Sequence, residues 1–525
     1  MPRSANLTIP RRPLRVIGGA VIALAIAALI ITLFWSILRA AATQQPSTSH
    51  VDLGYLIYIT TLQAVLSTAL SLVVGMALAW ALNRLRFPGR DLIIGLFASA
   101  IVTPGLVVAF GLLSVWGRSG WFGFLDIPVF GLGGVVAAHL IFDGAFAARI
   151  LLARLDGIPD GRLKTGQSLA LDPWTRFAVI DWPALRSTLP GLAAIIFLLA
   201  FTSFPIVLLL GGGPAVQTIE VAIYSAVRLD FDLSAAVQLA LVQIAICAVI
   251  IVLSSALAPL STSLDRSGEP RWRDAAMARW LQWLVLALAL LGFATPLLAV
   301  LADGIAGLGD VLVQRAFWAS LATSLWIGIA SALLALLLAL VIASARAASS
   351  SRLSRIVLGA PAYAYLAVPA VALSLGAFLL VRALGLLPET AAPFVVVVAN
   401  ALLSLPFAMA TLAPPFEAIA RSRGRLIRAL GLGGVRQFRE IEWPLIARDV
   451  GLVLALSFCF SLGDLGVIAL FGTQDFATLP LLLVRSLGAY RTHDAATIAA
   501  LMLVLTIAAF VALPKLFERL GRADA

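Results

Sequence analysis

The sequence predicts an all-α protein that crosses a membrane about twelve times. Hydrophobic residues make up 61% of the 525 residues and charged residues only 12%, which leaves too little polar surface to coat a soluble globule of this length. Apolar runs of about 20 residues recur along the chain, and at about 1.5 Å per helical residue each run matches a hydrocarbon core of roughly 30 Å. Alternating segments of about ten residues, typical of a membrane barrel, are not the pattern here.

Twelve spans are expected, and they fall into two sets of six. The first set lies near residues 16–38, 53–82, 92–113, 130–152, 188–210 and 235–258. The second set lies near residues 280–302, 316–343, 356–381, 392–413, 448–470 and 495–514. We therefore expect a first half over residues 1–258, a linker over 259–279 and a second half over 280–525. The first apolar run exceeds the hydrophobic region of a typical signal peptide, so a membrane helix is expected there.

The distribution of basic residues predicts the orientation. Of the 37 Lys and Arg residues, 30 lie in or at the edges of the N-terminus, the even-numbered loops and the C-terminus. The odd-numbered loops contain the other seven. Because basic loops stay in the cytoplasm, both termini are expected on the cytoplasmic side of a bacterial inner membrane. The net charge of +11 is then explained by topology and by contact with the lipid bilayer, and no nucleic-acid partner is expected.

No metal, disulfide or nucleotide site is expected on this chain. Cys247 and Cys459 both fall inside apolar spans, and the three histidines lack the spacing of a zinc cluster. The phosphate-binding pattern G-x-x-x-x-G-K-[ST] is absent from the sequence. Any use of ATP and Mg²⁺ is therefore expected on a partner chain, with no cofactor on this one.

An internal repeat relates the long loop after span four to the long loop after span ten. With an offset of 261 residues, identical pairs include Ile158/Ile419, Arg162/Arg423, Leu169/Leu430, Leu171/Leu432, Phe177/Phe438, Ile180/Ile441, Trp182/Trp443 and Pro183/Pro444. Each half contains an even number of spans, so the two copies enter the membrane in the same orientation. Both loops are rich in Leu, Trp and Arg, which predicts short helices on the cytoplasmic membrane face.

The second loop copy resembles the signature of binding-protein-dependent ABC importer permeases. Gly431 is followed after nine residues by Ile441, then by Trp443 and Pro444. The first copy departs from this pattern, because Ala170 replaces the glycine. The resemblance implies two type I permease halves and two coupling loops, each docking on one of two ATPase subunits. The residues assigned to these loops are Arg162, Leu169, Ala170, Leu171, Ile180, Trp182, Pro183, Arg423, Leu430, Gly431, Leu432, Ile441, Trp443 and Pro444. The alternative is a basic amphipathic loop lying on lipid.

A closer similarity is to the fused permeases of thiamine importers, and it extends over nearly the whole chain. The stretches that carry it are residues 194–214, 218–232 and 461–480. It implies import of thiamine and its phosphate esters, delivered by a periplasmic binding protein, with no covalent chemistry on this chain. Fused ferric iron permeases share part of the pattern and are the first alternative. A proton-coupled secondary transporter is the second, although it has no need of paired basic loops.

Two carboxylates within the expected spans are candidates for the transport path, because charge in hydrocarbon is costly and is kept where it has a use. Asp143 falls in the middle of span four, with His139 four residues earlier on the same helical face. Asp464 falls near the periplasmic end of span eleven. The structural alternatives are an ion pair of Asp143 with His139 or Arg149 and a hydrated helix end at Asp464.

Overall fold

The structure, a computed structural model, describes residues 13–43, 52–213, 216–255 and 274–523, and within these ranges every regular element is a helix. Nine of the described helices are long and apolar enough to cross a membrane, or ten if one bent pair is a single span. The all-α, multi-pass class is therefore confirmed, while the count of twelve stays a prediction. Most of the expected linker, residues 259–273, lies outside the described residues.

All twelve expected spans fall on helices within the described residues, but four of them fall on two helices in place of one. The eleventh, residues 448–470, corresponds to α20 (Trp443–Gly463) and α21 (Ile468–Phe471), and the other three are each divided between two short helices. Residues 92–113 correspond to α3 (Arg90–Ser99) and α4 (Gly105–Trp116), residues 188–210 to α9 (Leu189–Phe201) and α10 (Pro205–Leu210), and residues 356–381 to α16 (Arg352–Ala364) and α17 (Ala370–Ala383). Proline explains the breaks: Pro104 precedes α4, Pro205 begins α10, and Pro369 precedes α17. Proline has no amide hydrogen to continue a helix and restricts the residue before it.

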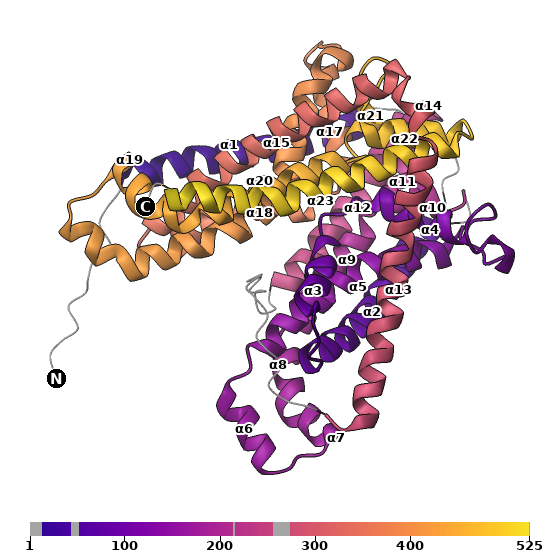
Figure 1. The fold of residues 1–525 in the computed structure, drawn as a ribbon. Coiled ribbons are helices and arrows are strands. Elements are labelled where there is room, and N and C mark those ends of the chain that lie inside the picture. The colour runs from indigo at the N-terminus through magenta and orange to yellow at the C-terminus, as the bar shows by residue number, and fades with distance from the viewer. Residues whose placement is uncertain (1–12, 44–51, 214–215, 256–273, 524–525) are drawn as a thin grey trace. The chain divides into compact units, whose positions relative to one another are not determined.

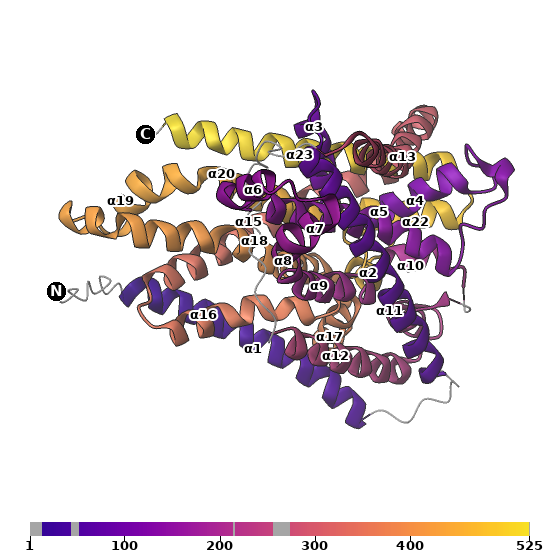
Figure 2. The same cartoon turned by 90° about the horizontal axis from the view of Figure 1, so that it is seen from below.

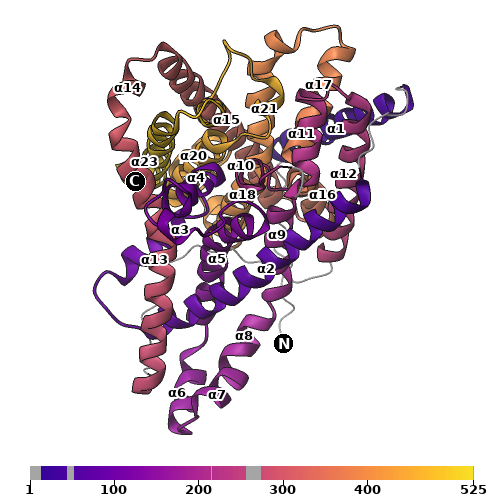
Figure 3. The same ribbon diagram turned by 90° about the vertical axis from the view of Figure 1, so that its right-hand side faces the viewer.

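The chain forms two compact units that do not follow its linear order. One unit comprises residues 46–318 and 479–504, and we refer to it as unit 2. Besides the helices already given, its elements are α2 (Leu53–Arg84), η1 (Gly123–Leu125), α5 (Leu132–Asp156), α6 (Asp160–Ser168), α7 (Pro173–Arg176), η2 (Phe177–Asp181), α8 (Trp182–Arg186), α11 (Ile219–Arg228), α12 (Leu233–Ser255), α13 (Ala276–Ala306), α14 (Leu308–Leu312) and α22 (Leu479–Gly488). Figure 3 shows α6 and α7 at the same end of this unit as one end of the long helix α13.

Unit 1 comprises residues 1–45, 319–478 and 505–525. Its further elements are α1 (Pro13–Thr43), α15 (Arg315–Ala348), η4 (Tyr365–Ala367), α18 (Pro388–Ala429), α19 (Gly434–Gln437), η5 (Phe438–Glu442), α20 (Trp443–Gly463) and α21 (Ile468–Phe471). Helix α15 begins in unit 2 and belongs to unit 1 from residue 319. The last helix, α23 (Thr492–Ala523), is divided between the units after residue 504. Figures 1 and 2 show α19 at the end of unit 1 where α1 begins.

The first helix of each expected half packs on helices of the other half. Within unit 1, α1 packs on α16 and α17, and the Ser36 hydroxyl donates a hydrogen bond of 2.8 Å to the carbonyl of Gly376. Within unit 2, α13 packs on α2 and α4, and Phe293 lies edge-on to Phe97 with ring centroids 5.5 Å apart. In the compact units, α1 is therefore grouped with helices of the second expected half, and α13 with helices of the first. The division into consecutive halves stays a prediction about the repeat.

Small residues allow the long helices to approach closely. A Cβ atom added at Gly75 of α2 would lie 2.4 Å from the Cβ atom of Ala147 in α5, and one added at Gly19 of α1 would lie 2.2 Å from that of Ala345 in α15. Both distances are far below van der Waals contact, so only glycine fits at these crossings. Close backbone approach through small residues is a general route to helix association in membranes, where burial of apolar surface supplies little driving force.

Candidate functional site

Two loops at corresponding places in the repeat form the candidate site. Loop 1 is defined here as residues 157–188 and contains α6, α7, η2 and α8, while loop 2 is defined as residues 418–449 and contains the last turns of α18, α19, η5 and the start of α20. Each includes one π-helical turn, at Phe177–Asp181 and Phe438–Glu442, and the repeat offset aligns these two turns residue by residue. The sequence repeat is therefore also a repeat of backbone structure.

The backbone turns with the same hydrogen bonds in both loops. The amide of Leu171 donates to the carbonyl of Gly166 at 3.2 Å, and the amide of Leu432 donates to that of Ile427 at 3.0 Å. Between them, Ala170 and Gly431 have positive φ angles of 48° and 63°. A left-handed residue with such a six-to-one hydrogen bond is a common helix ending, and glycine is its preferred residue. Ala170 adopts this conformation with a side chain, at a cost that glycine avoids.

The sequence-predicted loop residues separate into an exposed set and a buried set. Arg162, Arg423, Ala170 and Gly431 are exposed, and Leu169 and Leu430 are 66% and 59% exposed. Leu171, Leu432, Pro183, Pro444 and Trp443 are half-buried, Trp182 is 38% exposed, and Ile180 and Ile441 are buried. The leucines at the turn therefore face outward, while the isoleucines belong to the interior of each loop.

Sequence reasoning missed a second exposed apolar pair. Trp174 and Val435, which the same repeat offset aligns, are 76% and 82% exposed. Asp172 caps α7 beside Trp174, and the Thr175 hydroxyl together with backbone amides holds the pKa of its carboxyl below the usual range. Apolar side chains presented together on an exposed loop are typical of a contact surface. The repeat offset itself was the signal, because it aligns this tryptophan with a valine.

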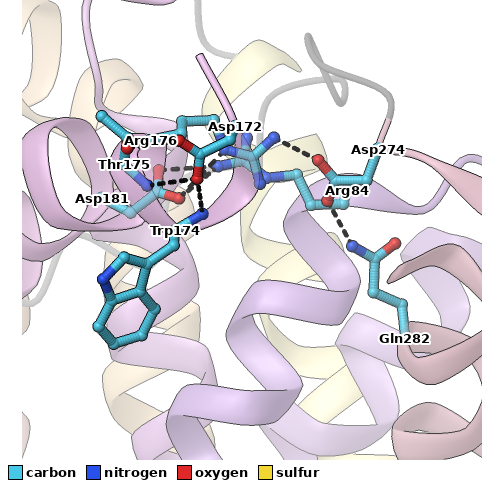
Figure 4. A network of polar contacts seen from close by, with 8 residues as sticks. All are labelled: Arg84, Asp172, Trp174, Thr175, Arg176, Asp181, Asp274 and Gln282. Carbon is cyan, nitrogen blue, oxygen red and sulfur yellow. Dashed lines mark hydrogen bonds and ion pairs between the residues drawn. The ribbon is translucent and has the colours of Figure 1, made fainter. Parts of the chain in front are cut away.

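A buried ion-pair network fixes loop 1 to the ends of two long helices. The Nη2 atom of Arg84, at the end of α2, donates to both carboxylate oxygens of Asp181 at 2.7 Å. Arg176 donates to the carboxylate of Asp274, just before α13, and Gln282 of α13 donates to the same carboxylate at 2.6 Å. Figure 4 shows Asp274 between Arg176 and Gln282. The side chains of the ion-paired residues are no more than 3% exposed, so every charge depends on its partner.

A corresponding network fixes loop 2 to α1. Arg15, in the first turns of α1, donates to the two carboxylate oxygens of Glu442 at 2.7 and 3.1 Å. Gln437 donates to the same carboxylate from within the loop. The side chain of Glu442 is 3% exposed. The repeat offset aligns Asp181 with Glu442, and the sequence showed both as acids, but it gave no sign of which arginine each one binds.

The two path candidates each have a local partner. Asp143 is fully buried within α5, and its Oδ2 lies 3.0 Å from the Nδ1 atom of His139. Asp464 follows the end of α20 and accepts hydrogen bonds from the backbone amides of Gly466 and Val467, with closest distances of 3.1 and 3.2 Å. It therefore caps the turn that leads into α21. Asp143 belongs to unit 2 and Asp464 to unit 1. Their role in a transport path stays a prediction.

The apolar spans define a multi-pass membrane protein, and the two equivalent loops give it a repeated surface with exposed apolar tips. No family model matches the chain. The thiamine transport system permease proteins ThiP of Escherichia coli K12 and Brucella melitensis are each 37% identical to it, over 88% and 85% of this chain and 89% and 84% of their own lengths. The ThiP protein of Haemophilus influenzae is 35% identical over 84% of this chain and 85% of its own length. The chain therefore belongs to the ThiP family of transport permeases, whose members are subunits and not enzymes.

A more distant relative matches only part of the chain. The molybdenum transport system permease protein ModB of Azotobacter vinelandii is 30% identical over 166 residues. This match covers 74% of ModB but only 30% of the present chain.

The Arg84–Asp181 pair yields a first prediction. Arg84→Ala leaves the carboxylate of Asp181 without its closest cation in the interior, and loss of one partner of a buried pair typically costs about 3 to 5 kcal/mol. We expect a clear fall in the thermal unfolding midpoint of the purified protein. The matched control is Arg436→Ala, which removes an exposed pair with Glu440 on the surface of loop 2. The control should have the same thermal unfolding midpoint as the wild type, since exposed pairs contribute little to stability. Equal midpoints for all three proteins would contradict the role given to Arg84.

Proposed function

We propose that this chain is the translocation subunit of an ATP-driven importer of thiamine and its phosphate esters in a bacterial inner membrane. The observation that carries the proposal is similarity to thiamine transport permeases along 84% to 88% of the chain, which includes sequence from both halves. Twelve spans, cytoplasmic termini, two ATPase subunits and a periplasmic binding protein belong to the same proposal. They rest on the charge distribution, on the repeat and on the family.

The loops supply the second line of support, since they suit a docking role for two copies of one partner. Leu169 and Trp174 in loop 1 have outward-facing counterparts in Leu430 and Val435 of loop 2. A loop held in place by ion pairs, with a few exposed apolar anchors, is a suitable docking element, because little conformational freedom is lost on binding. The ion pairs behind these anchors connect each loop to long helices. Movement of a bound ATPase would thereby be passed to the spans.

Alternating access is the mechanism that this architecture supports. A binding protein would deliver the cation at the periplasmic side, and closure of the ATPase subunits would move the loops and reorient the path. Thiamine is a flat cation whose transfer into hydrocarbon is unfavourable, so it needs a protein-lined path and an energy source. Ferric iron import and proton-coupled transport remain the alternatives, and both make different predictions.

The substrate is tested by uptake. Cells unable to synthesise thiamine should accumulate labelled thiamine from nanomolar supply only when this chain, its ATPase and its binding protein are all present. Excess unlabelled thiamine should abolish the signal, and ferric iron should not. Competition by iron would support the iron alternative. Uptake that persists with an ATPase unable to hydrolyse ATP, and collapses with the proton gradient, would support secondary transport.

Coupling is tested at Gly431. Space around this residue is open, but its positive φ disfavours any side chain, so Gly431→Trp should disturb the turn without creating a clash in the interior. We expect loss of thiamine uptake and weaker copurification of the ATPase at an unchanged membrane level. The matched control is Gly385→Trp, because Gly385 has a φ of 70°, is equally open and follows α17 in a loop expected on the periplasmic side. Equal uptake loss in both variants would argue against a specific docking role.

A path role for Asp464 is tested by separating its charge from its cap. Asp464→Asn keeps an oxygen that accepts the amide hydrogens of Gly466 and Val467 but removes the charge. Asp464→Ala removes both and should cost about 1 kcal/mol through loss of the cap. If the carboxylate contacts the cationic substrate, the asparagine variant should reach the membrane normally and import thiamine more slowly. Normal import by this variant would leave Asp464 with a capping role alone.

A further inference from the structure

The two loops differ in the sign of their buried charge, although their backbones correspond. In loop 1 and the adjoining end of α2, Arg84 and Arg176 stand against Asp181, so two positive charges and one negative charge leave one positive unit. In loop 2, Glu442 is buried beside the neutral Gln437, which leaves one negative unit. The repeat offset aligns Arg176 with Gln437, so the repeat itself has diverged at this position.

The first helix of each half supplies the opposite charge. Asp274, immediately before α13, neutralises the excess on loop 1, and Arg15 of α1 neutralises the excess on loop 2. Exchanging the two helices would place Arg15 beside two arginines and one aspartate, and Asp274 beside Glu442. Each exchanged pairing would bury two like units of charge without compensation. Burial of an unpaired charge in a protein interior is among the most destabilising changes known.

We propose that these buried charges are a pairing code that directs α13 to loop 1 and α1 to loop 2. Shape alone gives weak discrimination, since both loops have the same turn, the same π-helical segment and the same hydrogen bonds. Opposite polarity favours the observed partner and opposes the other, and specificity commonly needs both effects. Arg15, Arg176, Asp274 and Glu442 are thus positioning residues that determine which helix supports which loop.

The order of synthesis explains why α1 needs to discriminate between the two loops. Helix α1 and loop 1 leave the ribosome long before loop 2, so the first loop that α1 can meet is the wrong one. Arg15 opposes that contact because Arg176 already gives loop 1 a positive excess. Arg15 therefore remains available for Glu442, which is synthesised later. This inference concerns assembly and goes beyond the proposed function, since it depends on neither the substrate nor the ATPase.

The test reads which loop α1 contacts in the full chain. In a background with Cys247→Ala and Cys459→Ala, Leu14→Cys is combined with either Val435→Cys in loop 2 or Val179→Cys in loop 1. The three introduced positions are 83%, 82% and 61% exposed, so all of them are open to a short bismaleimide. A protease site is inserted into the expected linker, residues 259–279. After cleavage, a cross-link to loop 2 keeps the halves together on a denaturing gel, and a cross-link to loop 1 does not.

The decisive variant exchanges the charges of the helices and keeps the total charge of the protein constant. Arg15→Glu with Asp274→Arg should abolish the cross-link to loop 2 and lower the yield of monodisperse protein about tenfold. Adding Arg176→Glu and Glu442→Arg exchanges the charges of the loops as well. This quadruple variant should regain the cross-link to loop 2 and most of the yield.

Two outcomes overturn the proposal. One is a helix-exchanged variant with the wild-type cross-link and yield, because the charges would then not select the partner. The other is a quadruple variant that recovers neither readout, because the side chains would then act through shape and not through sign. The neutral pair Arg15→Gln with Asp274→Asn should lie between the wild type and the helix-exchanged variant, since it removes attraction without adding repulsion.

Discussion

Burial of charge at the loop ends of the long helices is the constraint on which the other features depend. Arg84 with Asp181, and Arg15 with Glu442, have side chains that are largely or fully removed from solvent. Such pairs need good geometry to offset their desolvation, and the structure provides it through double contacts to each carboxylate. Once these pairs are fixed, the loops have defined positions on their helices, and the leucines at the turns are left facing outward.

The sequence predicted the fold class and the loops because both can be read directly from the residues, without knowledge of which segments pack together. Long apolar runs identify membrane helices, and the repeat offset identified the two loops as equivalent. The sequence could not identify the ion-pair partners, because Asp274 and Arg15 come from distant parts of the chain. The packing of α1 and α13 on helices of the other half could not be predicted for the same reason. A long apolar run predicts that a helix lies in the membrane, but it does not predict which helices that helix packs on.

The interrupted helices illustrate a second limit. An apolar run of about 20 residues satisfies a hydropathy criterion whether it is one helix or two, and Pro104 and Pro369 lie inside such runs. A break in the membrane leaves backbone groups that protein must satisfy. At the end of α20 the side chain of Asp464 does so for Gly466 and Val467. A charged residue that the sequence suggested as a path element thus has a structural task at a break.

The two halves differ at buried polar positions inside the spans. The offset that superposes the loops also aligns His139 with Asn400 and Asp143 with Ser404, and all four are buried. His139 and Asp143 contact one another, whereas the Asn400 amide donates to the Ser461 hydroxyl at 2.9 Å. One half thus carries an ionisable pair where the other carries neutral groups. Under the proposed function, two copies of one ATPase would require similar loops, whereas an asymmetric cation would not require similar interiors.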